Sequence, residues 1–135
     1  MDRKRILIGE DDETILAMTK LRLEHEGYEV VTASDGETAL QMARAAGSPP
    51  IHLVLLDVKM PALSGYDVCL ALKQEPATAR IPVIVFSASE PNQQRLVNRC
   101  IEIGAEDWLK KPFRAHELMA KIRRALEEQE GSEHG

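Results

Sequence analysis

The stretch Leu53–Pro61 constrains the fold more than any other part of the chain, because four apolar residues lead directly into an aspartate. A short, unbroken apolar run is typical of a strand that is covered on both faces in a parallel sheet. Pro61 and the pair Ser64-Gly65 mark a turn after it. Open α/β sheets bind ligands at the carboxyl edge of their strands, which is where Asp57 stands. Asp57 is therefore the first candidate functional residue, although a polar residue that merely ends a strand explains this stretch alone equally well.

Apolar runs and helical patterns alternate along the rest of the chain. Strands are predicted at 6–9, 28–33, 53–57, 82–86 and 106–109, and helices at 14–26, 37–46, 65–73, 93–103 and 115–129. In the first helix the predicted apolar stripe consists of Ile15, Leu16, Met18, Leu21 and Leu23. The alternation predicts an α/β fold, a doubly wound, five-stranded parallel sheet with five helices.

Length, charge and cysteine content narrow the class of protein. The 135 residues indicate one domain at 1–130, followed by a disordered tail or the start of a linker at 131–135. A net charge of −5 argues against direct nucleic-acid contact by this chain. The apolar run at 6–8 is too short for a signal peptide or a membrane span. Cys69 and Cys100 lack metal-binding spacing, so we expect two reduced thiols in the core of a cytoplasmic protein.

The carboxyl ends of four predicted strands carry polar side chains. In chain order they are Glu10, Asp11 and Asp12, then Asp57, then Ser87, then Lys111. Because these ends meet at one edge of a parallel sheet, we expect the side chains to converge. Carboxylates without neighbouring histidine or cysteine suit Mg²⁺, and a lysine with a hydroxyl suits a phosphoryl group. The set predicts an aspartate that accepts a phosphoryl group beside a bound Mg²⁺.

Other interpretations of these residues remain open at this point. The acidic run at 10–13 also suits a helix N-terminus, Ser87 an ordinary strand end, and Lys111 a solvated surface. A phosphatase with an aspartyl intermediate would need a second carboxylate just after the nucleophile, where this chain has Lys59. A flavin-binding protein would need aromatic stacking and a phosphate-binding loop, yet Trp108 is the only tryptophan and no such loop is evident. The convergence of complementary groups favours the phosphoacceptor.

The chain resembles the receiver domain of bacterial two-component response regulators over about residues 4–128. The matching motifs are ILIGEDDE at 6–13, LLDVKMP at 55–61 with Gly65, VFSA at 85–88, GAEDWL at 104–109 and KPF at 111–113. This resemblance implies a flavodoxin-like receiver fold. It also implies a signalling module rather than an enzyme, since such a domain assists only its own phosphorylation and dephosphorylation.

The resemblance also implies roles for individual residues. Asp57 would accept the phosphoryl group from a sensor histidine kinase, a phosphotransfer protein or a small phosphodonor. Asp11 would bind Mg²⁺ directly, Glu10 through water, and Lys59 only through its backbone carbonyl. In addition, the phosphoryl oxygens would contact Ser87 and Lys111, and the bond from Lys111 to Pro112 would be cis.

Trp108 occupies the position of the switch aromatic in this family, whose movement accompanies that of Ser87. Phosphorylation would then change the surface formed by the helix 93–103, the strand 106–109 and the helix 115–129, to which a partner binds. Trp108 is larger than the usual residue, which is expected to restrict its inward rotamer. The alternative is a receiver-like domain that binds its partner without phosphorylation. That surface is also compatible with a homodimer, and the sequence identifies neither the kinase nor the output domain or target protein.

Overall fold

The computed structural model describes residues 3–45, 50–88 and 92–134. The strands are β1 (Arg5–Gly9), β2 (Glu29–Ala33), β3 (Leu53–Asp57), β4 (Val83–Ser87) and β5 (Asp107–Lys110). The helices are α1 (Glu13–His25), α2 (Gly36–Ala45), α3 (Gly65–Gln74), α4 (Gln93–Ile103) and α5 (Ala115–His134). All strand pairs are parallel and their order is β2-β1-β3-β4-β5. This confirms the predicted fold class.

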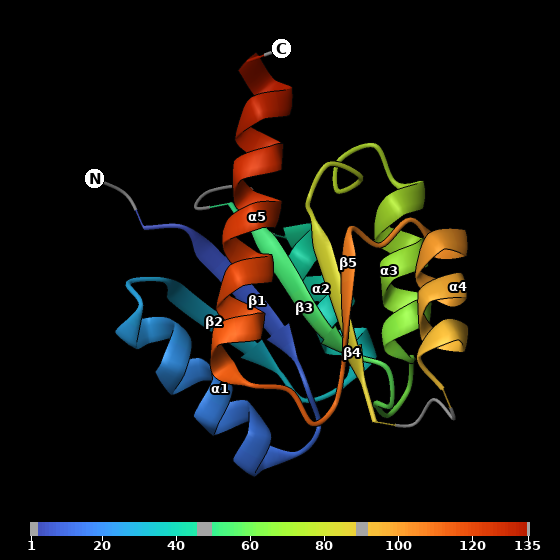
Figure 1. Cartoon of the computed structure of the whole chain (residues 1–135). Coiled ribbons are helices and arrows are strands. Elements are labelled where there is room, and N and C mark those ends of the chain that lie inside the picture. Colours follow the sequence, from blue (N-terminus) through green and yellow to red (C-terminus); the bar gives the residue numbers. More distant parts are fainter. Residues whose placement is uncertain (1–2, 46–49, 89–91, 135) are drawn as a thin grey trace.

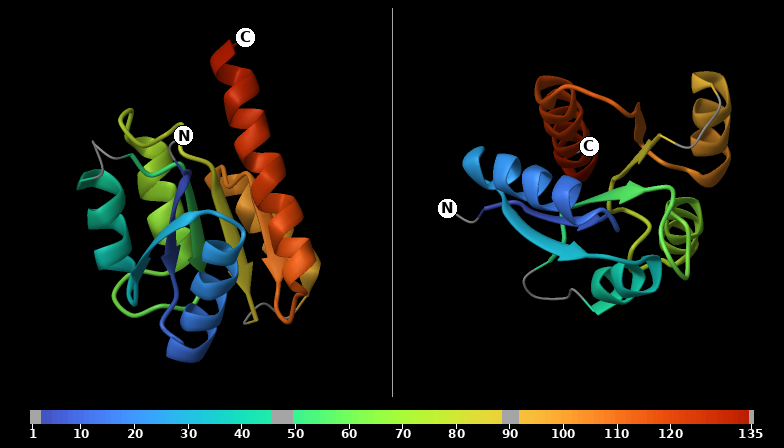
Figure 2. Two further views of the ribbon diagram at one scale, coloured as in Figure 1. Left: turned by 90° about the vertical axis from the view of Figure 1, so that its left-hand side faces the viewer. Right: turned by 90° about the horizontal axis from the view of Figure 1, so that it is seen from below.

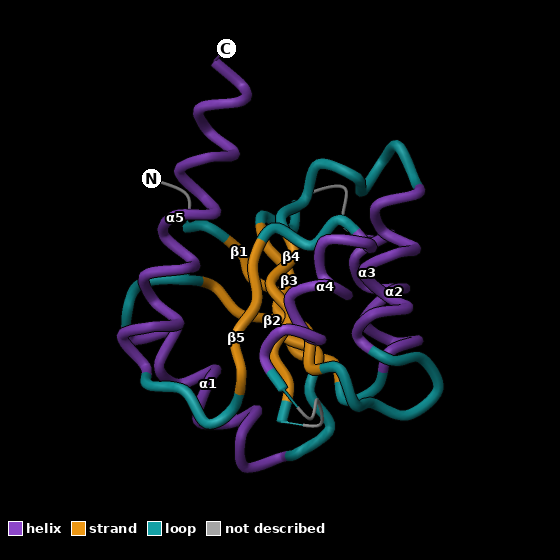
Figure 3. Tube along the Cα trace, turned by 45° about the vertical axis from the view of Figure 1, so that its right-hand side comes forward, coloured by secondary structure: helices purple, strands orange, loops and turns teal. Residues whose placement is uncertain are grey.

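The sheet forms a central layer with helices on both faces (Figures 1 and 3). Seen from below, α1 and α5 cover one face while α2, α3 and α4 cover the other (Figure 2). Successive strand side chains point to opposite faces, so each inner strand contributes to both cores. All five residues of β3 are buried, which explains its unbroken apolar pattern.

The carboxyl ends of the strands lie together at the lower edge of the sheet in Figure 1, and α5 projects beyond the opposite edge. β1 lies between β2 and β3, so the chain reverses direction in the strand order beside β1 and β3. This is the switch point where open α/β sheets bind ligands. Residues that follow β1, β3, β4 and β5 are consequently neighbours, as the sequence predicts.

The predicted apolar stripe of α1 is wrong in part. Met18 and Leu21 are 68% and 70% exposed, and Leu23 is the one buried residue of the helix. Leu16 packs on the same core as Leu23, which lies two helical turns after it in α1. Because α5 shares this face of the sheet with α1, only a narrow seam of α1 reaches the core. The remaining apolar residues of α1 therefore face outwards.

Element ends differ by a few residues from the predictions. Pro82 precedes β4 rather than opening it, and its carbonyl accepts a hydrogen bond from the backbone N–H of Val54 at 3.0 Å. The last helix continues to His134 instead of ending at Gln129. Ala46, the predicted end of the second helix, and Gly135 lie outside the described residues.

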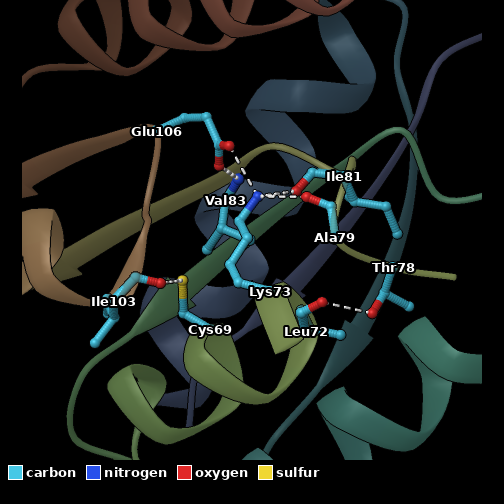
Figure 4. Close-up of polar contacts among 9 residues, drawn as sticks. All are labelled: Cys69, Leu72, Lys73, Thr78, Ala79, Ile81, Val83, Ile103 and Glu106. Atoms are coloured by element: carbon cyan, nitrogen blue, oxygen red, sulfur yellow. Dashed lines mark hydrogen bonds and ion pairs between the residues drawn. The ribbon is translucent and has the colours of Figure 1, made fainter. Parts of the chain in front are cut away.

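At the amino edge of the sheet, a polar cluster ties α3 to the starts of β4 and β5 (Figure 4). Lys73 Nζ donates to the carbonyls of Ala79 and Ile81, at 3.2 and 2.8 Å, and to Glu106 Oε2 at 2.8 Å. Glu106 Oε1 in turn accepts from the backbone N–H of Val83 at 2.7 Å. The cluster fixes the residue that directly precedes β5.

Two further predictions can be compared with the structure. Cys69 and Cys100 are both free thiols and both buried, as expected. Burial raises the pKa of Cys69 to about 12, which keeps this thiol protonated. Across the described residues, none of the helices has the length and apolar character needed to cross a membrane.

Candidate functional site

Asp57 ends β3 and is only 6% exposed. Its strand is held on both sides, by β1 and by β4, where Asp57 pairs in register with Phe86. The following turn approaches closely: the backbone N–H of Gly65 donates to the Val58 carbonyl at 2.8 Å. A Cβ at Gly65 would lie 2.3 Å from the Asp57 carbonyl oxygen, so glycine is required there. The backbone that carries Asp57 is therefore firmly positioned.

Two of the three acidic residues that follow β1 join Asp57. Carboxylate oxygens of Glu10, Asp11 and Asp57 lie within 4.8 Å of one another. Glu10 is 1% exposed, and its backbone N–H donates to the Ala33 carbonyl at 3.0 Å. Asp12 instead caps α1, accepting from the backbone N–H groups of Thr14 and Ile15, both at 3.0 Å. Asp12 thus stands at a helix N-terminus, as the alternative interpretation of the acidic run has it.

Lys111 reaches this cluster from the end of β5. Its Nζ lies 2.6 Å from Glu10 Oε1 and 3.3 Å from Asp57 Oδ1. The same ammonium stands over the ring of Phe86, 4.9 Å from its centroid. The surface-lysine interpretation is wrong, because this side chain is largely buried between two carboxylates and an aromatic ring. The bond to Pro112 is cis, as the resemblance implies.

Ser87 ends β4 at the same edge and is fully buried. Its backbone carbonyl accepts a hydrogen bond from the backbone N–H of Lys111 at 2.8 Å. The ends of β4 and β5 are thus joined directly beside the acidic cluster. A displacement of Lys111 consequently acts on Ser87 through this hydrogen bond.

The charges of the site are unbalanced. The site contains three carboxylates, of which two are buried, and the ammonium of Lys111. Burial, together with the hydrogen bond and negative charge of Glu10, raises the pKa of Asp57 to about 7, while Lys111 acts in the opposite direction. A hard divalent cation fits this donor set, since carboxylate oxygens are the ligands that Mg²⁺ prefers. Glu10, Asp11 and Asp57 are the residues that would hold it.

Two further residues have predicted roles: Lys59, through its backbone carbonyl alone, and Trp108 in β5. The Lys59 side chain is exposed. Trp108, in β5, packs against the core on the α2–α4 face, and Lys121 Nζ lies 5.1 Å from its ring centroid. No sequence pattern signals the contact of Lys111 with Phe86 or of Lys121 with Trp108. A strand phenylalanine and a helix lysine are ordinary in those segments, and only the packing of the chain brings them to these partners.

Comparison with known proteins agrees with this geometry. The family model described as response regulator receiver domain matches residues 6–123. The alkaline phosphatase synthesis transcriptional regulatory protein PhoP of Bacillus subtilis is 35% identical over 127 residues, and the transcriptional regulatory protein CpxR of Escherichia coli is 40% identical over 129. These alignments cover 94% and 96% of this chain but 50% and 52% of the relatives. The chain thus spans about half the length of the curated relatives it matches.

Solved structures show the same likeness. A CheY-like response regulator receiver domain protein from Methanospirillum hungatei superposes with a TM-score of 0.86 at 30% identity, over 97% of this chain and 99% of that one. The receiver domain of a signal transduction histidine kinase from Syntrophus aciditrophicus gives a TM-score of 0.81 at 34% identity, over 92% and 90%. Sequence, fold and site therefore agree, and this chain belongs to the response regulator receiver domain family.

Proposed function

We propose that this chain is the phosphoacceptor module of a two-component system, in which Asp57 takes a phosphoryl group from a sensor histidine kinase or a phosphotransfer protein. The observation that carries the proposal is the convergence at the carboxyl edge. The oxygens of Glu10, Asp11 and Asp57 gather within 4.8 Å, and Lys111 Nζ lies 2.6 Å from Glu10 and 3.3 Å from Asp57. This set offers a nucleophile, a cation site and a positive charge for phosphoryl oxygens.

In the proposed reaction, an Asp57 carboxylate oxygen attacks the phosphorus atom of the donor. The bond from phosphorus to the donor breaks, and the leaving imidazole or acetate keeps the electron pair. Mg²⁺ held by Glu10, Asp11, Asp57 and the Lys59 carbonyl would supply positive charge to the carboxylates and to the phosphoryl oxygens. Lys111 and the hydroxyl of Ser87 bind those oxygens as they arrive.

The phosphorylated aspartate carries about −1.5 to −2 charges at neutral pH, which alters the competition for Lys111. Its ammonium, held by Glu10 in the unphosphorylated protein, is attracted by the new oxygens. Because Lys111 follows β5 and is bonded to Ser87, this attraction acts on both strands. The surface of α4, β5 and α5, with Trp108, then shifts to the arrangement that the partner binds.

Intact mass after incubation with acetyl phosphate tests the proposal. We expect a gain of one phosphoryl group that requires Mg²⁺ and is abolished by EDTA and by Asp57→Asn. A gain that persists in Asp57→Asn would place the acceptor elsewhere. Absence of any gain with Mg²⁺ present would instead favour a domain that binds its partner without phosphorylation.

The partner that donates the phosphoryl group is proposed to dock on α1. Two adjoining grooves, of 490 and 680 Å³, share Met18, Thr19 and Phe113 in their linings. The smaller groove includes Lys111 and so borders the site, while the larger continues along α1 past Leu21. Exposed apolar side chains beside a reacting group suit a protein surface that must bring its phosphohistidine to Asp57.

Met18→Glu is expected to separate docking from chemistry. Acetyl phosphate needs no protein surface, so its Mg²⁺-dependent reaction with Asp57 remains unchanged. Phosphotransfer from any purified sensor kinase that phosphorylates the wild-type chain slows by about tenfold or more, because a charge is placed in an apolar contact. The matched control is Lys20→Glu, on the same helix but outside both grooves. Equal rates for Met18→Glu and wild type would exclude this face.

A further inference from the structure

Lys121 of α5 contacts two consecutive residues at the start of β5. Its Nζ lies 2.7 Å from Asp107 Oδ1 and 5.1 Å from the centroid of the Trp108 ring. The same Asp107 oxygen accepts a hydrogen bond from the backbone N–H of Trp108 at 2.8 Å. One ammonium therefore links the backbone and the ring of Trp108 to α5.

β5 is an edge strand of four residues, and within the described ranges β4 is its one neighbour in the sheet. Its start is held from two sides, because Lys73 binds Glu106 and Lys121 binds the next residue, Asp107. Its other end leads into Lys111 at the acidic cluster. A movement of β5 that begins at Lys111 is consequently opposed by the ion pairs of Lys73 and Lys121 at the start of the strand.

The two contacts of Lys121 differ from ordinary surface pairs. The Lys121 and Asp107 side chains are 26% and 17% exposed, so water screens their attraction only in part. Tryptophan is the aromatic side chain that attracts a cation most strongly. The contact with the ring would have to lengthen if the indole left its present position, and the ion pair with Asp107 keeps the ammonium beside that ring.

We propose that Lys121 is a positioning residue that holds Trp108 in its unphosphorylated position and so opposes the response to phosphorylation at Asp57. This inference rests on the proposed function. A contact made in one of two states shifts the equilibrium towards that state by the contact's own free energy. Removing Lys121 therefore favours the phosphorylated arrangement without altering any group that binds the phosphoryl oxygens.

The test is a titration with beryllofluoride, a non-covalent phosphoryl mimic, in the presence of Mg²⁺. Trp108 is the only tryptophan, so its emission reports this residue alone. We expect Lys121→Met to lower the midpoint by about twofold to fivefold, as expected for one cation–π contact and one partly exposed ion pair. Acrylamide should also quench the emission of the unliganded variant more strongly than that of wild type.

Three further variants give the comparison its controls. Lys121→Arg keeps the charge and should restore the wild-type midpoint. Asp107→Asn removes the ion pair but keeps the cation over the ring, so it should give a smaller decrease. Arg124→Met removes a neighbouring cation of α5 whose partner is Glu128 of the same helix, and it should match wild type.

The outcomes distinguish this inference from the proposed function. Intact mass after acetyl phosphate is measured on the same samples. Normal phosphorylation of Lys121→Met with an unchanged midpoint and unchanged quenching would overturn the role of Lys121 alone. An equal decrease of the midpoint in Arg124→Met would show that any lost positive charge on α5 has this effect, and it would also overturn the role of Lys121. Absence of both mass gain and emission change in wild type would overturn both proposals.

Discussion

Lys111→Met is expected to slow the Mg²⁺-dependent phosphorylation of Asp57 by acetyl phosphate by about a hundredfold, the loss typical of removing one donor aimed at developing oxyanion charge. Methionine nearly fills the same volume but carries no charge. The loss of Lys111 leaves the buried carboxylates of Glu10 and Asp57 without their shared ammonium. The pKa of Asp57 therefore rises further above its ordinary value. Less of the nucleophile is then ionised, and the phosphoryl oxygens lose a partner.

The rate of mass gain at fixed acetyl phosphate and Mg²⁺ measures this effect. Lys20→Met is the matched control, because Lys20 is exposed on α1. Circular dichroism of both variants should show the same helix and strand content as wild type. A Lys111→Met rate within about twofold of the control would remove Lys111 from the reaction.

Asp57→Asn is expected to stabilise the protein at pH 8 in EDTA by about 2–4 kcal/mol, although it abolishes phosphorylation. An ordinary aspartate titrates near 3.8, whereas burial beside Glu10 raises the pKa of Asp57 to about 7. Between these values the folded state binds more protons than the unfolded state, so wild-type stability falls as pH rises from about 4 to 7. Asparagine has the same shape as aspartate and no charge, so the stability of the variant does not fall in this way as pH rises.

Urea unfolding at pH 4.5 and pH 8 measures the difference. The stabilisation should be large at pH 8, small at pH 4.5, and reduced at pH 8 by added Mg²⁺, which binds the wild-type carboxylates. Asp35→Asn is a control of opposite sign. Hydrogen bonds from Thr38 lower the pKa of Asp35, so its charged form is the favoured one and its loss destabilises. Equal stability of wild type and Asp57→Asn at pH 8 would contradict the assigned environment of Asp57.

Much of the fold could be predicted because the pattern of β3 is local. A strand with five consecutive buried residues has to lie between two layers of helices, and Asp57, as its last residue, then stands at the carboxyl edge of the sheet. The convergence of Glu10, Asp57 and Lys111 followed from topology alone, since ends of parallel strands meet. These inferences depend on the period and order of elements, which the sequence contains directly.

Other features depend on contacts that no local pattern contains. The exposure of Met18 and Leu21 results from the position of α5, which occupies the sheet surface that a wider stripe of α1 would cover. Asp11 joins the acidic cluster whereas Asp12 caps α1, and this difference depends on the direction in which the chain leaves β1. The pairing of Lys121 with Trp108 needs two segments from different layers to meet at the sheet edge. Each of these is decided by tertiary packing.

The division of the interior by the sheet has a consequence for how such proteins diverge. α1 contributes one fully buried side chain, Leu23, to a core that is separate from the one beneath α2, α3 and α4. Substitutions at its exposed positions usually change stability by no more than about 0.5 kcal/mol. Under the docking proposed for α1, duplicated copies could therefore change this helix to accept new phosphoryl donors while the carboxyl edge and the opposite layer stay intact, which would keep parallel signalling pathways separate.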